Sequence, residues 1–181
     1  MMVRLKNNDD HFGLIAILLH WSMALLIIAM LALGLYMVRL PISLEKLKLY
    51  GWHKEYGFLV LFLVVFRLVW RLYNITPHLS LPILEKIAAR LAHYAFYGFM
   101  FAMPISGWLV TSAAGLPASF FGLFTLPDLI GPNEEMRLYF QWVHQWLAYA
   151  LIATIALHTI AALKHHFINK DTILWRMISW K

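Results

Sequence analysis

The chain has 181 residues, of which 62% are hydrophobic and 13% charged, with a net charge of +6 and a mean hydropathy of +0.69. Soluble domains are apolar in about half of their residues, so this composition excludes an ordinary soluble protein and predicts one embedded in a lipid bilayer. The absence of cysteine excludes disulfides and metal clusters held by thiolates.

Four long apolar stretches divide the chain, and each approaches or exceeds the roughly 20 residues that cross the hydrocarbon layer as a helix. We predict helices at about 14–38, 51–72, 86–111 and 138–165. The first is too long for a signal-peptide core and has no small-x-small cleavage site, so we expect it to remain as a helix. Without linkers, low-complexity segments or repeats, the sequence predicts one all-α domain over residues 1–181, a four-helix membrane bundle.

The connections between these helices contain prolines and glycines. We expect residues 44–49, which are amphipathic, to form a short interfacial helix or turn. Pro77 and Pro82 should stop the second helix and precede the third. Residues 111–137 predict an irregular periplasmic flap, part of which rests on the bilayer or on the top of the bundle.

Lysine and arginine are unevenly distributed between the two ends of the predicted bundle. One end has ten: Arg4, Lys6, Arg67, Arg71, Lys86, Arg90, Lys164, Lys170, Arg176 and Lys181. The other has five: Arg39, Lys46, Lys48, Lys54 and Arg137. The positive-inside bias therefore places both termini in the cytoplasm. Anionic lipid there accounts for the net charge, and no nucleic acid partner is expected.

Five histidines lie within or at the ends of the apolar stretches: His20, His53, His93, His144 and His158. An ionisable side chain inside a membrane span needs a polar partner there, which makes it a functional candidate. For a single histidine the alternative is a hydrogen bond to a neighbouring helix. Five of them at two depths argue against this alternative.

The spacing of the histidines predicts two pairs. His144 and His158 are 14 residues apart, a rise of roughly 21 Å with an angular offset of about 40° on an α-helix. They therefore face the same side, one near each membrane surface. His20 lies near the start of the first helix, at the depth of His158, and His53 opens the second helix at the depth of His144.

Two imidazoles fill both axial positions of a haem iron, which favours electron transfer over oxygen binding. The residues four positions after the paired histidines share their helix face and are all small, namely Ala24, Gly57, Ala148 and Ala162. Small residues are also common in membrane helices for packing reasons. His93 is instead followed by Tyr97, so we expect it beside the cytoplasmic haem or a quinone. With no cysteine for attachment, the sequence predicts two non-covalent haem b groups.

Arg67 repeats the 14-residue step from His53, and Arg71 follows one turn later. Their guanidinium groups suit haem propionates, although anchoring at the cytoplasmic surface is an equally simple interpretation. Gly34 and Gly107 stand 14 residues after His20 and His93. They either leave room for a macrocycle at the depth of the other haem or serve ordinary packing.

His165 and His166 end the fourth helix. One interpretation is a solvated helix end favoured by the helix dipole. The other makes one of them, for which we take His165, a hydrogen-bond or proton partner for a quinone beside the cytoplasmic haem.

The ordered set of these residues resembles the bacterial cytochrome b561 family, related to the membrane cytochrome b subunits of nickel hydrogenases and formate dehydrogenases. The likeness runs along nearly the whole chain through His20-Trp21, Gly51-Trp52-His53, Leu91-Ala92-His93, Pro104-Ile105-Ser106-Gly107, Trp142-Val143-His144 and Lys164-His165-His166-Phe167. The resemblance implies haem ligation by His53 with His144 and by His20 with His158, the pairing reached from depth. It also implies a multi-pass protein of the bacterial inner membrane that exchanges electrons between the periplasm and the quinone pool.

Three functions are compatible with the sequence. The first is a quinone-linked oxidoreductase that takes electrons from a periplasmic donor, either superoxide, as the resemblance implies, or a redox protein, and reduces ubiquinone or another quinone. The second is a non-catalytic cytochrome b subunit that docks a soluble dehydrogenase or hydrogenase. The third is a haem-free transporter with a histidine relay for protons.

Overall fold

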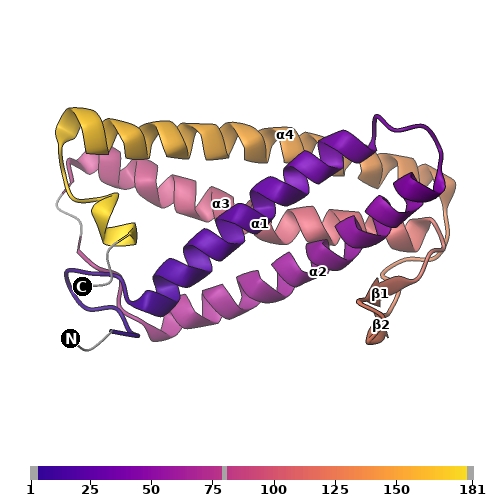
Figure 1. The fold of residues 1–181 in the computed structure, drawn as a ribbon, viewed down its shortest axis with the longest axis horizontal. Coiled ribbons are helices and arrows are strands. Elements are labelled where there is room, and N and C mark those ends of the chain that lie inside the picture. Colours follow the sequence, from indigo (N-terminus) through magenta and orange to yellow (C-terminus); the bar gives the residue numbers. More distant parts are fainter. Residues whose placement is uncertain (1–3, 79–80, 179–181) are drawn as a thin grey trace.

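The structure is a computed structural model that describes residues 4–78 and 81–178. Its four long helices are α1 (Leu14–Met37), α2 (Leu44–Tyr73), α3 (Ile83–Ala113) and α4 (Glu134–Lys164), and they run along the length of the molecule (Figure 1). The connection between α3 and α4 contains an antiparallel hairpin of β1 (Ala118–Phe120) and β2 (Phe124–Leu126). A π-helical turn, η1 (His165–Asn169), and a 3-10 turn, η2 (Trp175–Met177), follow α4. The predicted all-α four-helix architecture is confirmed.

The helices have the surface of a protein whose solvent is lipid. α1, α2 and the continuous helix of α4 and η1 are each long and apolar enough to cross a membrane. Large apolar side chains face outward, among them Leu25 at 68% exposure and Leu157 at 69%. The buried core is small and centres on Met23, Val64 and Met100. An apolar exterior around so small a core is the arrangement that a bilayer stabilises and water does not.

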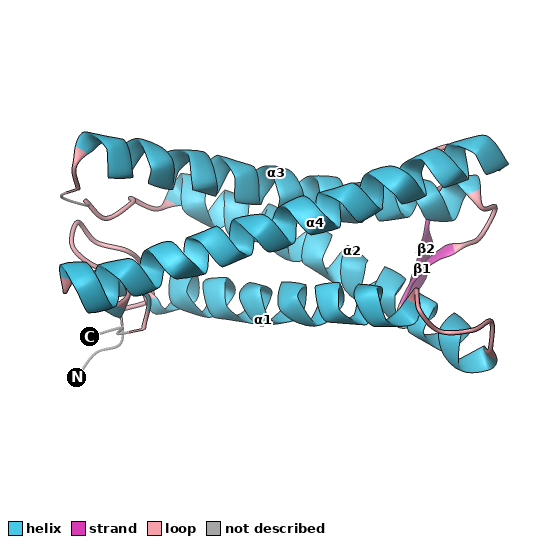
Figure 2. Ribbon diagram, turned by 90° about the horizontal axis from the view of Figure 1, so that it is seen from above, coloured by secondary structure: helices cyan, strands magenta, loops and turns pink. Residues whose placement is uncertain are grey.

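Helices that follow one another in the chain pack together. α1 packs against α2, α2 against α3 and α3 against α4. In the part of the chain that the structure describes, α4 does not pack closely against α1 or α2. Figure 2 shows the four helices in a second view, in which the hairpin again lies at one end of the bundle. Long side chains must therefore bridge the distance between α4 and the pair formed by α1 and α2.

Three helices begin earlier than the sequence suggested, α3 by the smallest amount, at Ile83 instead of residue 86. α2 starts at Leu44 instead of residue 51, because the Ser43 side chain accepts a hydrogen bond from the Lys46 backbone N–H and caps the first turn. The amphipathic residues 44–49, expected to form a separate interfacial helix or turn, are thus the first turns of α2. α4 starts at Glu134 instead of residue 138, with Asn133 as the equivalent cap.

The flap between α3 and α4 is more regular than expected, since it contains the hairpin. Its turn includes Phe121 and Gly122, both with positive φ (48° and 70°). Phe120 packs edge-on against Phe62 of α2, with ring centroids 5.1 Å apart, and Phe121 packs against Tyr56 at 5.3 Å. The hairpin therefore rests on α2, and we call this the hairpin end of the bundle.

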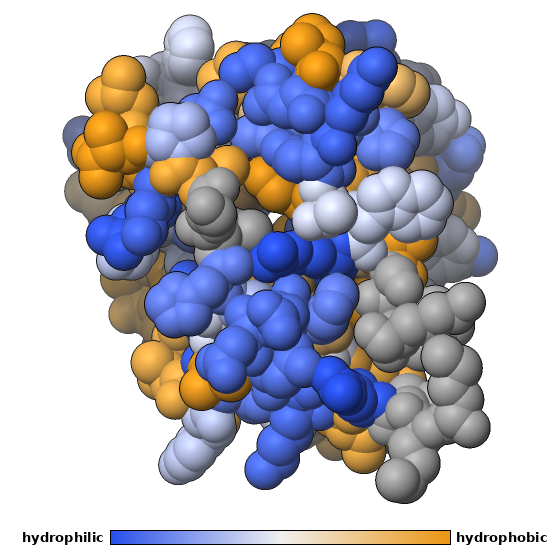
Figure 3. Space-filling view, turned by 90° about the vertical axis from the view of Figure 1, so that its left-hand side faces the viewer, coloured by the Kyte–Doolittle hydropathy of each residue, from blue (hydrophilic) through white to orange (hydrophobic). Residues whose placement is uncertain are grey.

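The described N-terminal segment, the α2–α3 connection and the C-terminal tail are joined at the opposite end, which we call the terminal end. The His78 backbone N–H donates to the Asp9 carbonyl, and an Arg176 N–H donates to the His78 carbonyl. The Trp21 indole donates to the Met177 carbonyl, which ties the tail to α1. Viewed from this end, the surface is largely hydrophilic (Figure 3), so the terminal end is suited to an aqueous compartment.

Candidate functional site

The pair at the hairpin end consists of His53 on α2 and His144 on α4. Their ring centroids lie 6.1 Å apart, with an angle of 77° between the ring planes. Each ring lies against a glycine of the neighbouring helix: a Cβ at Gly34 would come within 3.2 Å of His53 Cε1, and one at Gly107 within 3.3 Å of His144 Cε1. Gly34 and Gly107, for which the sequence allowed two interpretations, therefore make room for the imidazole rings of this pair.

The two rings at the hairpin end differ in their hydrogen bonding. His144 Nδ1 lies 2.8 Å from Ser106 Oγ, and Ser106 Oγ also lies 2.8 Å from the Met103 carbonyl oxygen. His53 Nδ1 is buried and has no hydrogen-bond partner among the described residues. A buried polar atom without a partner is uncommon in proteins, and it is consistent with a site that a bound group completes.

The pair at the terminal end consists of His20 on α1 and His158 on α4, with ring centroids 6.3 Å apart and an angle of 60° between the planes. Arg67 lies beside this pair, with Nη2 3.4 Å from His20 Nδ1. Phe96 of α3 packs edge-on against His158 at 5.2 Å. The structure thus places Arg67 next to a paired histidine, as the 14-residue step from His53 suggested.

Of two further predicted residues, His93 lies near the terminal-end pair, and Arg71 lies near His93. The Arg71 guanidinium lies over the Tyr97 ring, 5.5 Å from its centroid. His93 has Arg71, His158 and Arg67 as charged or ionisable neighbours. Tyr97, the side chain expected to crowd a macrocycle, packs against the core around Met23, Val64 and Met100.

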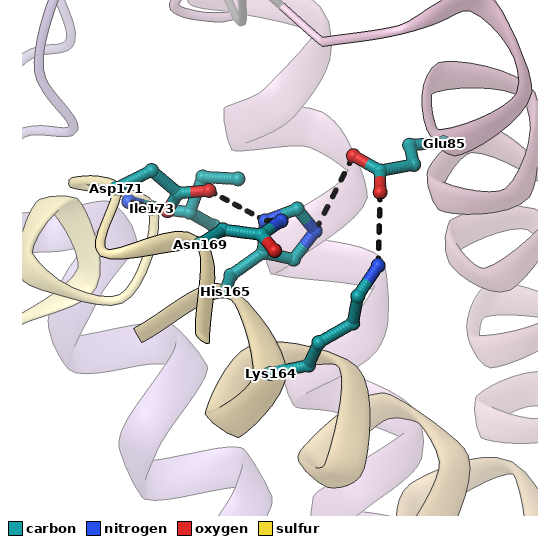
Figure 4. A network of polar contacts seen from close by, with 6 residues as sticks. All are labelled: Glu85, Lys164, His165, Asn169, Asp171 and Ile173. Atoms are coloured by element: carbon teal, nitrogen blue, oxygen red, sulfur yellow. Dashed lines mark hydrogen bonds and ion pairs between the residues drawn. The ribbon is translucent and has the colours of Figure 1, made fainter. Parts of the chain in front are cut away.

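His165 belongs to a polar network at the terminal end (Figure 4). Its Nδ1 lies 2.5 Å from Asp171 Oδ2, and its Nε2 lies 3.9 Å from Glu85 Oε2. Lys164 pairs with the other oxygen of Glu85 at 3.1 Å. These contacts tie the C-terminal tail to α3 through the end of α4. Sequence reasoning singled out His165 but missed Glu85 and Asp171, because nothing in their local pattern shows that the fold brings them together.

Asp171→Asn should loosen the tail at neutral pH. Burial raises the pKa of the Asp171 carboxyl, but hydrogen bonds from the Ile173 backbone N–H and from His165 outweigh it, so that the pKa lies below its ordinary 3.8. A lowered pKa stabilises the folded state above the ordinary pKa, and this contribution is lost as the pH falls through the lowered value. We expect several-fold faster trypsin cleavage after Arg176 at pH 7.5. Asp128→Asn, in the connection at the hairpin end, is the control, and an equal rate in both variants would contradict a role for the network.

Both histidine pairs fit a haem held by two axial imidazoles. A metal–imidazole bond of about 2 Å, with the ring centroid about 1 Å behind the nitrogen, separates two opposed rings by roughly 6 Å, which is close to the observed 6.1 and 6.3 Å. Within residues 4–78 and 81–178, no group of three His, Cys, Asp or Glu could hold a bare metal ion. Two imidazoles alone would leave a metal ion incompletely coordinated, so each pair would hold iron only together with a further group such as a porphyrin.

Comparison with known proteins agrees with this geometry. The model of the prokaryotic cytochrome b561 family matches residues 11–180. Cytochrome b561 homolog 2 of Escherichia coli (strain K12) is 35% identical over 182 residues, which cover 95% of this chain and 93% of that protein. The probable superoxide oxidase CybB of Yersinia pestis is 30% identical over 135 residues, 71% of this chain and 74% of that protein. The chain therefore belongs to the prokaryotic cytochrome b561 family and is a haem-binding, electron-transferring protein of a bacterial membrane.

Proposed function

We propose that the chain binds two haem b groups, one between His53 and His144 and one between His20 and His158, and passes electrons across the inner membrane to a quinone. The observation that carries this proposal is the presence of two histidine pairs, one toward each end of the bundle, at the ring separation that axial ligation requires. Iron with two imidazole ligands supplies one-electron chemistry with no open coordination position.

The orientation in the membrane follows from the distribution of charge. The terminal end holds most of the basic residues counted in the sequence, of which Lys181 lies outside the described residues. The positive-inside bias assigns this end to the cytoplasm and the hairpin end to the periplasm. The terminal-end pair is then the cytoplasmic one, and a rise of roughly 21 Å between His144 and His158 separates the two sites.

Arg67 and Arg71 are proposed to bind the propionates of the cytoplasmic haem. Arg67 already lies at 3.4 Å from a paired imidazole, within reach of a carboxylate on any group bound there. Arginine presents a planar set of donors that matches a carboxylate bidentately. Arg71, one turn further along α2, lies over the Tyr97 ring and adds a second positive charge near His93.

The proposed donor acts at the hairpin end and the proposed acceptor, ubiquinone or another quinone, at the terminal end. A relative of this chain is named as a probable superoxide oxidase, so superoxide is the first donor to test. The hairpin end has a mixed charge: Lys48 lies over the Trp52 ring, whereas Arg137 is paired with Glu134. Such a surface admits a small anion without a strong positive field.

The test is to add superoxide to the purified protein and follow the haem absorbance, then to add a short-chain ubiquinone. We expect reduction by superoxide, abolished by superoxide dismutase, and reoxidation by the quinone. The alternative, a docking subunit, would be favoured if superoxide left the haem oxidised but a soluble dehydrogenase or hydrogenase reduced it in a complex with the chain. A protein that purifies without haem from cells with ample haem supply would contradict the whole proposal.

His93→Ala should keep both haems and slow quinone reduction by about a hundredfold, the usual range for a lost acid–base group. His93 lies near Arg71, Arg67 and His158, but the two axial positions at this end are already assigned to His20 and His158. We therefore propose that His93 hydrogen-bonds a quinone headgroup. Haem content and the rate of quinone reduction measure the effect.

Tyr94→Ala is the matched control for His93→Ala, because Tyr94 is the next residue of α3 and is 71% exposed. Tyr94→Ala should retain both haems and reduce quinone at the wild-type rate. Loss of the cytoplasmic haem from His93→Ala, together with its retention in His20→Ala, would instead show that His93 is the ligand.

A further inference from the structure

The hydroxyl of Ser106 lies directly behind the His144 ring. Ser106 is on α3, one helix away from His144 on α4, and is only 5% exposed. Its Oγ is 2.8 Å from His144 Nδ1 and 2.8 Å from the Met103 carbonyl oxygen. The close approach of the two helices at Gly107, the next residue, brings the ring within reach of this hydroxyl.

The direction of these hydrogen bonds follows from counting protons. A serine hydroxyl has one proton, and a carbonyl oxygen can only accept. If Ser106 donates to the Met103 carbonyl, its lone pairs face His144, and the proton between them belongs to Nδ1. His144 then donates from Nδ1 and keeps the Nε2 lone pair free for a metal. This is the tautomer that a ligand bound through Nε2 needs.

Among the described residues, neither His53 nor His20 has a hydrogen-bond acceptor behind its Nδ1 atom. His53 Nδ1 is buried without a hydrogen-bond partner among the described residues. His20 Nδ1 faces Arg67, and a guanidinium is only a donor. A hydrogen-bond acceptor behind a ring is a specific feature, because it fixes both the tautomer and the orientation of the ring and makes the ligating nitrogen more basic.

We propose that Ser106 is a positioning residue for the hairpin-end haem, which acts through His144 by accepting a hydrogen bond from Nδ1. A more basic ligand stabilises ferric over ferrous iron, so Ser106 lowers the midpoint potential of this haem. The proposal rests on the haem ligation proposed above and adds to it the residue that sets the tautomer and the ring orientation of one ligand.

The test compares Ser106→Ala with Ser106→Thr, which keeps a hydroxyl, in the purified holoprotein. Thr111→Val is the matched control: Thr111 is also 5% exposed, and its hydroxyl donates to the Gly107 carbonyl in the same helix. The readouts are the midpoint potentials from a redox titration of the haem absorbance and the low-field EPR signal of ferric haem, which responds to the angle between the axial rings. His144→Ala and His20→Ala assign each signal to one end.

Ser106→Ala should raise the potential of the hairpin-end haem and move its EPR signal, while the other haem stays unchanged. Ser106→Thr should restore the wild-type values, and Thr111→Val should not disturb them. If the midpoint potential of the hairpin-end haem were unchanged or lower in Ser106→Ala, the inference would be wrong. The proposed function would still stand as long as the protein binds two haems per chain. A wild-type protein that lacks the hairpin-end haem would overturn both.

Discussion

His144→Ala should reduce the haem content from two to one per chain and leave the haem at the terminal end. His144 and His53 face each other at 6.1 Å, whereas the other pair is formed by His20 and His158. Loss of one ring removes one axial bond at one end only, and the remaining imidazole holds haem weakly. Pyridine haemochrome content per polypeptide gives the number, and EPR of the ferric protein shows which site is left.

His166→Ala is the control for this variant. His166 packs against Phe167 and Trp175 at the terminal end and belongs to neither pair, so its replacement should leave two haems. If His144→Ala removed both haems, the two pairs would belong to one shared site. If it retained both, His144 would not be a ligand.

Gly107→Leu should remove the hairpin-end haem without replacing any ligand. A Cβ at this position would already stand 3.3 Å from His144 Cε1, closer than ordinary van der Waals contact. The larger leucine side chain must displace the ring from its partner, and a ligand moved by about 1 Å no longer forms a bond whose length is near 2 Å. We expect one haem per chain in Gly107→Leu. Gly107→Ala should have a milder effect: it should retain both haems and shift only the midpoint potential of the hairpin-end haem.

Gly98→Leu is the matched control, since Gly98 lies on the same helix and a Cβ there would meet nothing within 4 Å. It should retain both haems. Equal haem contents in Gly107→Leu and Gly98→Leu would show that the close approach at Gly107 has no bearing on haem binding.

The parts of the site that depend on helical periodicity could be predicted from the sequence. A 14-residue step returns to nearly the same face of a helix, so His144 and His158 were expected on one side of α4 at two depths. The structure brings His53 to the first and His20 to the second. The same step led to Gly34, although the sequence left open whether it serves packing or makes room for a bound group.

The parts that depend on contacts between elements could not be predicted. Ser106 belongs to a quoted motif, but its contact with His144 depends on how α3 and α4 pack. Likewise, His165 was expected to face solvent or a quinone, and its contacts with Asp171 and Glu85 depend on how the tail folds back. The early start of α2 follows from the cap at Ser43, a local signal that Pro41 and the charges nearby obscured.

The ratio of haem to polypeptide in the purified wild-type protein tests the central claim most directly. The pyridine haemochrome assay, combined with a quantitative amino-acid analysis of the same sample, gives this ratio without any assumption about donor or acceptor. Two histidine pairs predict two non-covalent haem b groups per chain, extractable with acidified acetone because the chain has no cysteine. A ratio of one, or of zero, in protein from haem-sufficient cells would contradict the assignment of two sites.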